Sequence, residues 1–181
     1  MKWMIASDIH GSAYYCERLM ERYRAEGADR LLLLGDILYH GPRNDLPRDY
    51  APREVIALLN AQKDKILCVR GNCDAEVDDM VLAFPVRSDM LMIASGERMI
   101  VATHGHIYHK EHLPPMQKGD VLLYGHTHVP ACEEFDGVFC LNPGSVSIPK
   151  EGSWHGYMTF EENCFFWKDT DGNEKRRFSL V

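Results

Sequence analysis

The chain has 181 residues, of which 45% are hydrophobic and 26% are charged, and its formal net charge at pH 7 is -7. This composition is typical of a globular protein, and the length suits a single domain over residues 1–181. The negative charge argues against stable nucleic acid binding, which depends on a basic surface. Because no apolar run approaches the roughly 20 residues of a membrane span, and six scattered cysteines form no CxxC pair, we expect a cytoplasmic protein without a membrane partner.

The amino-terminal half of the sequence alternates between predicted strands and helices. Short apolar runs at residues 2–6, 30–34 and 65–69 predict strands, whereas residues 12–26 and 51–62 have helical spacing. Strands that are almost continuously apolar suit a sheet covered on both faces.

The carboxyl-terminal half changes character, because strand candidates follow one another with few helices between them. Predicted strands lie at residues 90–94, 98–103, 120–125, 137–142, 155–160, 164–167 and 176–181. One helix-covered sheet cannot readily absorb so many strands. We therefore predict a mixed α/β fold in which two β-sheets pack together.

Polar side chains suited to metal binding follow directly after the predicted strands. They are Asp8, His10, Asp36, Asn72, His104, His126 and His128. The carboxyl ends of strands in open α/β sheets form the crevice where ligands bind, so we expect these side chains to converge. His126 and His128 would point to the same side of an extended chain, although two such histidines taken alone could equally lie in a surface turn.

These side chains provide two carboxylates, one amide and four imidazoles, which are too many donors for one four-coordinate ion. Two ions joined by a bridging carboxylate fit the set better. A single catalytic zinc with three protein ligands is the alternative, but it leaves several strand-end residues without a role. Nitrogen and oxygen donors favour Mn, Fe, Zn, Co or Ni over Cu(I), and four imidazoles argue against Mg or Ca.

The order of the motifs resembles that of the calcineurin-like metallophosphoesterase superfamily. The matching segments are DIH at 8–10, GD at 35–36, GNCD at 71–74, THGH at 103–106 and GHTH at 125–128. The stretches GDILYHGPRN, VRGNCD and LNPGSVSIPK further resemble the small bacterial YfcE-type phosphodiesterases, from residue 2 to about residue 150. The resemblance implies a four-layer αββα sandwich of two mixed β-sheets flanked by helices.

The resemblance also implies how the ligands divide between two metal ions. The first ion would take Asp8, His10, Asp36 and His128, and the second would take Asp36, Asn72, His104 and His126. Asp36 would then hold a metal-bridging hydroxide, with Asn72 and His104 near the phosphate. The ions would be divalent, with Mn expected first and Ni, Co, Fe or Zn as alternatives. The glycine before His126 would let the chain turn tightly.

The implied activity is the metal-dependent hydrolysis of small phosphodiesters. Many larger members of the family have a histidine where this chain has Cys73, placed to assist the leaving oxygen. Because a thiol is a poor proton donor there, we expect a preference for aryl-type diesters. The roles of His40, Arg43 and His106 stay open: Arg43 could contact the phosphate, and a hydrogen bond to a ligand is favoured over direct coordination for His106.

Two alternative functions are kept beside the phosphodiesterase. The first is a phosphomonoesterase or nucleotide hydrolase, since pocket shape and not the ligand set separates these activities. The second is a non-catalytic protein-binding scaffold, the role of Vps29, a retromer subunit of the same fold. The intact Asp8 and His10 motif favours an enzyme. The resemblance makes a homo-oligomer reasonable.

Overall fold

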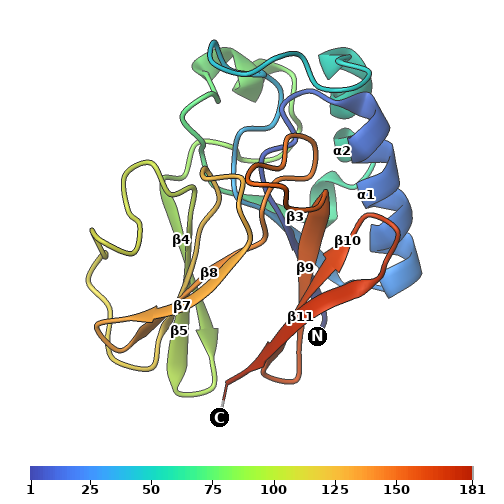
Figure 1. Ribbon diagram of the computed structural model, residues 1–181. Coiled ribbons are helices and arrows are strands. Elements are labelled where there is room, and N and C mark those ends of the chain that lie inside the picture. The colour runs from blue at the N-terminus through green and yellow to red at the C-terminus, as the bar shows by residue number, and fades with distance from the viewer. Residues whose placement is uncertain (181) are drawn as a thin grey trace.

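Two β-sheets form the centre of the computed structural model, which describes residues 1–180 (Figure 1). The six-stranded sheet has the order β11-β10-β9-β1-β2-β3, and the five-stranded sheet has the order β4-β5-β6-β8-β7. The strands are β1 (Trp3–Ala6), β2 (Arg30–Leu33), β3 (Ile66–Cys68), β4 (Met90–Ser95), β5 (Arg98–Thr103), β6 (Val121–Leu123), β7 (Ala131–Phe135), β8 (Val138–Asn142), β9 (Gly156–Glu161), β10 (Cys164–Asp169) and β11 (Glu174–Ser179). Both sheets are mixed, which confirms the predicted fold class.

Parallel strands place the carboxyl ends that matter for function on one side of the molecule. β1, β2 and β3 are mutually parallel, with Ile5 opposite Leu32 and Leu32 opposite Leu67. In the other sheet β5, β6 and β8 are parallel. All of these strands run upward in Figure 1, so the loops that follow them gather at the top, away from both termini.

Two helices cover the outer face of the six-stranded sheet, and both were predicted. α1 (Ala13–Glu26) begins after Ser12, whose side chain accepts a hydrogen bond from the Tyr15 N–H, and it ends at Gly27 with φ 61°. α2 (Pro52–Asn60) has proline in its first turn. Their apolar faces pack on the buried side chains of β1 to β3. None of the helices within residues 1–180 is long and apolar enough to cross a lipid bilayer.

A second core fills the space between the sheets. Ile5 and Leu32 from one sheet meet Leu123 from the other, together with Phe165 and Trp167. Trp167 is fully buried, and its indole N–H donates to the Asn142 carbonyl at 2.7 Å. Since Asn142 ends β8, this bond ties β10 of one sheet to the last residue of a strand in the other.

The outer face of the five-stranded sheet is covered by a coil segment, residues 104–120, rather than by a helix within the described residues. Leu113 and Met116 of this segment pack on Val101, Leu122 and Val138. The sequence did not predict β7, whose residues are mostly exposed and lack an apolar alternation. The 3-10 helices η1 (Lys63–Lys65) and η2 (Glu76–Met80) were also missed. The last predicted strand is confirmed as β11, although Val181 lies outside the described residues.

Replacing Trp167 with alanine should lower the free energy of unfolding by about 3–5 kcal/mol, because the change leaves a cavity between the sheets. Urea denaturation followed by circular dichroism measures the loss. Phe135, which is 46% exposed on the edge strand β7, provides the control, and Phe135→Ala should cost less than about 1 kcal/mol. Equal losses in both variants would mean that the core between the sheets contributes little.

Candidate metal centre

The loops after β1, β2, β3, β5 and β6 bring the seven predicted side chains to one place. Three overlapping groups have ligand atoms within 4.8 Å of one another: Asp8, His10 and His128; His10, Asp36 and Cys73; and Asp36, His104 and His126. Asn72 joins the last group, because its Oδ1 lies 3.1 Å from His104 Nε2. The groups overlap at His10 and Asp36, so together they form one centre with two halves.

The first half is built around Asp8, a fully buried carboxylate. Its Oδ2 accepts hydrogen bonds from the Ser7 hydroxyl at 2.6 Å and the His126 N–H at 3.0 Å. Its Oδ1 is buried without a hydrogen-bond partner, 3.5 Å from His10 Nε2 and 3.2 Å from His128 Nε2. A buried carboxylate oxygen is rarely left unsatisfied, so this atom is suited to a cation.

The second half meets the first at Asp36. The Cys73 N–H donates to Asp36 Oδ1 at 2.8 Å, which fixes the carboxylate and leaves Oδ2 facing the centre. Oδ2 lies 3.6 Å from His10 Nε2 and 3.4 Å from His104 Nε2. One oxygen therefore faces imidazoles from both halves, which is the position that a bridging ligand requires.

Backbone carbonyls determine which nitrogen of each histidine carries the proton. The Nδ1 atoms of His10, His104 and His128 lie 2.7, 2.6 and 2.7 Å from the carbonyl oxygens of Tyr39, Leu34 and Ile148. A carbonyl only accepts, so each Nδ1 carries the hydrogen and each Nε2 turns a lone pair inward. The facing Nε2 atoms of His10 and His128 are only 3.2 Å apart. Two lone pairs at that distance repel each other unless a cation lies between them, so the donor set fits divalent metal ions.

The pKa values of these side chains also indicate that the centre favours positive charge. Burial alone would lower the pKa of His104, but its hydrogen bond to Asp36 and the charge of Asp8 raise that pKa to about 9. Burial and the neighbouring His104 lower the pKa of His126 to about 4. Burial would raise the pKa of Asp8, yet the close imidazoles of His10 and His128 hold that pKa well below its ordinary value. The carboxylates therefore stay charged, and without a metal a proton on His104 takes the place of a cation.

The backbone of the centre adopts an unusual conformation. The left-handed region is occupied by Asp8, His10, Asp36, His126 and His128, with φ of 58°, 49°, 56°, 66° and 63°. Residues other than glycine rarely adopt this backbone conformation, which costs of order 1 kcal/mol or more at each residue. The expectation that His126 and His128 share one side of an extended chain is wrong, because each lies in a turn and they point into different halves.

Two glycines allow the loops to approach one another. A Cβ on Gly71 would lie 2.1 Å from Asp36 Oδ1, and a Cβ on Gly125 would lie 1.9 Å from the Ser7 hydroxyl oxygen. Gly125 is not in the left-handed region itself, but the chain turns tightly directly after it, since the Thr127 N–H donates to the Gly125 carbonyl at 2.7 Å. It is required because the loop after β6 passes directly over the loop after β1.

Sequence reasoning assigned no role to Asp74, although it is the last residue of the GNCD motif. Its carboxylate accepts hydrogen bonds from the N–H groups of Asp36 at 2.8 Å, Ile37 at 2.8 Å and Gly71 at 2.7 Å. Asp74 thereby fixes the loop after β2 to the loop after β3. A carboxylate two residues after Asn72 was the available signal, because backbone N–H groups in turns need such an acceptor.

The loop after β8 supports the opposite side of the centre. The hydroxyls of Ser145 and Ser147 donate to the Asp8 carbonyl at 2.8 and 3.1 Å, and Asn142 Nδ2 donates to the Gly125 carbonyl at 2.8 Å. These bonds fix the backbone at two strained turns. The LNPGS stretch predicted only a turn, because the carbonyl groups to which its side chains donate lie far away along the chain.

Cys73 and two of the three residues whose roles were open, Arg43 and His106, line clefts at the centre. Arg43 and Cys73 line a cleft of about 420 Å³ that opens onto Asp36, His126 and His128. Burial and nearby Asp36 raise the pKa of the Cys73 thiol to about 12, so this side chain is neutral. His106 lines a neighbouring cleft. The Nδ1 atoms of His106 and His40 are both buried without a hydrogen-bond partner. The hydrogen bond expected between His106 and a ligand is therefore not formed at Nδ1.

Sequence comparison identifies relatives over most of the chain. The sequence model of the calcineurin-like phosphoesterase superfamily domain matches residues 1–163. The phosphodiesterase YfcE of Escherichia coli strain K12 is 48% identical over 157 residues, which cover 87% of this chain and 85% of the relative.

Structural comparison agrees with the sequence. The solved structure of the YfcE phosphoesterase from E. coli superposes with a TM-score of 0.96 at 42% identity and covers 100% of both chains. A Vps29 variant from Entamoeba histolytica superposes with a TM-score of 0.65 at 20% identity over 100% of both chains. The second likeness shows a shared fold and carries no information on activity.

The substitution Asp74→Asn should weaken Mn²⁺ binding by about 10–100-fold, because the amide N–H₂ group would face a backbone donor and release one of the two loops. Titration calorimetry on chelator-treated protein measures the affinity, and circular dichroism checks the fold. Asp64→Asn, at an exposed carboxylate in η1, serves as the matched control and should bind Mn²⁺ normally. If both variants bound Mn²⁺ equally well, Asp74 would not position the ligands.

Proposed function

The chain belongs to the calcineurin-like phosphoesterase superfamily, and from this premise we propose that it is a metal-dependent phosphodiesterase acting on small phosphodiesters. The position of Asp36 Oδ2, which lies 3.6 Å from His10 Nε2 and 3.4 Å from His104 Nε2, is the main support for this proposal. A carboxylate oxygen between two sets of imidazoles suits a centre of two ions. The name of the relative that is 48% identical, a phosphodiesterase, supports the reaction class.

We propose that Asp8, His10, Asp36 and His128 hold one divalent ion and that Asp36, Asn72, His104 and His126 hold the other. The mixture of nitrogen and oxygen donors suits Mn²⁺, with Ni, Co, Fe or Zn as alternatives. When bound, two such ions would supply a bridging hydroxide as nucleophile and would neutralise the phosphoryl oxygens during in-line displacement. A single zinc with three protein ligands would leave the second group of donors without a function.

The chain's own residues orient the substrate. Asn72 is exposed at the cleft, and its Oδ1 lies 3.1 Å from His104 Nε2, which supports a role for both side chains near the substrate phosphate. The Cys73 N–H fixes Asp36, and the Tyr39, Leu34 and Ile148 carbonyls keep the three Nε2 atoms pointing inward. These fixed contacts pre-organise the donors, so little reorganisation is needed when the substrate binds.

Cys73 supports a preference for aryl diesters. Its thiol lines the cleft beside Asp36, and burial raises its pKa to about 12. Such a thiol gives up its proton reluctantly, so it is a weak general acid near neutral pH. Aryl leaving groups need little protonation, whereas alkyl leaving groups need much more.

The same proposal covers the domain organisation, the cellular location and the partners of the enzyme. We treat residues 1–181 as one domain, because β10 and β11 extend the sheet that contains β1. The six free cysteines suit a reducing cytoplasm, and the net charge of -7 is unfavourable for stable nucleic acid binding. The family resemblance makes a homo-oligomer reasonable. The seven metal-competent side chains favour catalysis over a scaffold role.

Removal of metal should abolish hydrolysis of bis(4-nitrophenyl) phosphate, because water at the centre would no longer be activated and the pKa of about 12 keeps the Cys73 thiol neutral. The measurement compares this diester with 4-nitrophenyl phosphate after chelation and after addition of Mn, Ni, Co, Zn or Mg. Mn²⁺ should restore the diesterase activity most strongly, and Asp36→Asn should prevent the restoration. Activity that survives chelation contradicts the mechanism, and a faster monoester reaction would identify a phosphomonoesterase.

The substitution Cys73→His should increase the turnover of alkyl diesters and change that of aryl diesters little, because an imidazole can protonate a poor leaving group. Steady-state kinetics on a methyl ester and a 4-nitrophenyl ester of the same phosphate separate the two effects. Cys164→His, on β10 and away from the cleft, is the matched control. Unchanged alkyl ester turnover in Cys73→His would remove the leaving-group argument.

A further inference from the structure

Two clefts of unequal chemistry meet at the metal centre. The first, of about 420 Å³, contains Arg43, Cys73 and Lys150, and the second, of about 460 Å³, contains Tyr124 and Glu133. His126 and Thr127 line both clefts. Both volumes lie in the range of small-molecule sites. A phosphodiester has two ester arms, so a phosphate at the centre could extend one arm into each cleft.

The first cleft is cationic. Within residues 1–180 neither the Arg43 guanidinium nor the Lys150 ammonium forms an ion pair, and the only carboxylate in the cleft lining is Asp36 of the metal centre. The chain as a whole has a net charge of -7, so two cations in one cleft that form no ion pair are a local exception, even though Asp45 and Glu151 are near them along the chain. An anion in this cleft would be attracted without displacing an existing partner.

The first cleft is also fixed to the metal centre. Asn44 Nδ2 donates to the His40 carbonyl at 2.8 Å, and a Cβ on Gly41 would lie 3.1 Å from Cys73 Sγ, so the loop that carries Arg43 packs closely on Cys73. On the other side, the Lys150 N–H donates to the His128 carbonyl at 3.2 Å. The backbones of both cations are therefore held beside residues of the centre.

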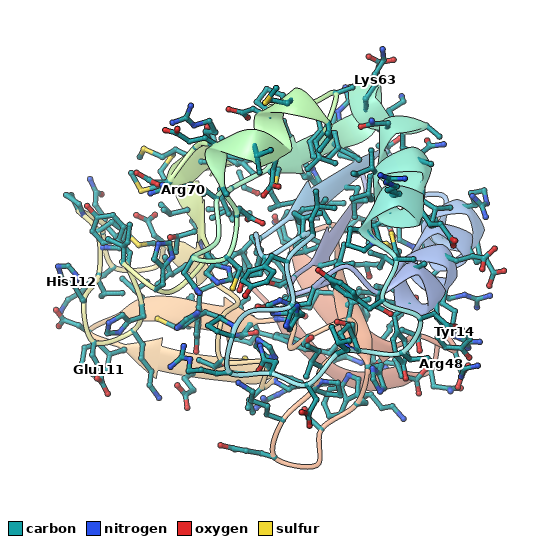
Figure 2. All side chains as sticks on the ribbon, turned by 90° about the horizontal axis from the view of Figure 1, so that it is seen from above. Tyr14, Arg48, Lys63, Arg70, Glu111 and His112 are labelled. Carbon is teal, nitrogen blue, oxygen red and sulfur yellow. The ribbon has the colours of Figure 1, made fainter. Side chains whose placement is uncertain are left out.

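The second cleft has the opposite character. Its lining includes three carboxylates, Glu111, Glu133 and Glu151, and the Lys110 ammonium is already paired with Glu133 at 2.8 Å. Tyr124, Val129 and Ala131 add apolar surface. Figure 2 shows Glu111 on the side of the molecule opposite Tyr14 and Arg48. An anionic arm would be repelled here, whereas an uncharged aromatic or alkyl arm could be accommodated.

We propose that the preferred substrate is an asymmetric phosphodiester whose leaving arm carries a second anionic group, a carboxylate or a phosphate. That group binds Arg43 and Lys150 in the first cleft, beside Cys73, and the uncharged arm lies in the second cleft. This inference rests on the proposed phosphodiesterase function. It adds a substrate class and two specificity-determining side chains to that function.

The test compares two chromogenic diesters that differ by one carboxylate on the leaving ring: phenyl 4-nitrophenyl phosphate and phenyl 3-carboxy-4-nitrophenyl phosphate. The Mn²⁺-loaded protein should prefer the carboxylated diester by about tenfold in kcat/KM, the size expected of two exposed ion pairs. The double variant Arg43→Gln, Lys150→Gln should bring the ratio of the two kcat/KM values close to one. The double variant Arg53→Gln, Lys65→Gln, with the same change of net charge at exposed positions on α2 and η1, should keep the preference.

A binding measurement separates this inference from the proposed function. On chelated protein, titration calorimetry with 5-hydroxy-2-nitrobenzoate and with 4-nitrophenol should show tighter binding of the carboxylate, lost in the Arg43→Gln, Lys150→Gln variant alone. If both diesters were hydrolysed with equal efficiency, the inference would be wrong and the phosphodiesterase would stand. If the cleft variant lost both diesters in the same proportion, the two cations would serve the scissile phosphate instead, which also overturns the inference. If neither diester were hydrolysed with any metal while the carboxylate still bound selectively, the proposed function would fail and the anion site would remain.

Discussion

The structure around the centre depends on one electrostatic requirement. Several oxygen and nitrogen lone pairs point at the same place, and this arrangement is stable only when positive charge lies between them. Asp8 Oδ1 is buried without a hydrogen-bond partner, and the Nε2 atoms of His10 and His128 face each other at 3.2 Å. Hydrogen bonds to backbone carbonyls prevent these imidazoles from turning their N–H groups inward. Such an arrangement is unfavourable by itself and favourable around a cation, so the fold holds the donors ready for metal binding.

The remainder of the fold offsets the cost of this arrangement. The candidate ligand residues with positive φ store backbone strain, and the surrounding loops must hold them in place. Asp74 does so on one side through three backbone N–H groups, and Ser145 does so on the other through the Asp8 carbonyl. These loops in turn extend from strands buried in two apolar cores, so packing far from the centre determines its geometry.

The sequence predicted the parts of the protein that depend on local pattern. Apolar runs that end in Asp, Asn or His indicated both the strands and the side chains that converge as candidate ligands, because strand periodicity and residue chemistry are visible locally. β7 was missed because an exposed edge strand such as ACEEF has no apolar alternation. Asp74 and Lys150 were missed because their roles depend on loops that meet only in three dimensions, and the turns at His126 and His128 have no local signature.

We propose that Asp36 is shared by two metal ions. X-ray data collected at the manganese absorption edge from crystals grown with MnCl₂ test it most directly. A shared Asp36 should give two anomalous peaks about 3.5–4 Å apart, one beside Asp8 and His128 and the other beside His104 and His126, with Asp36 Oδ2 between them. A single peak, or two peaks that leave Asp36 outside the coordination sphere of either ion, would contradict it.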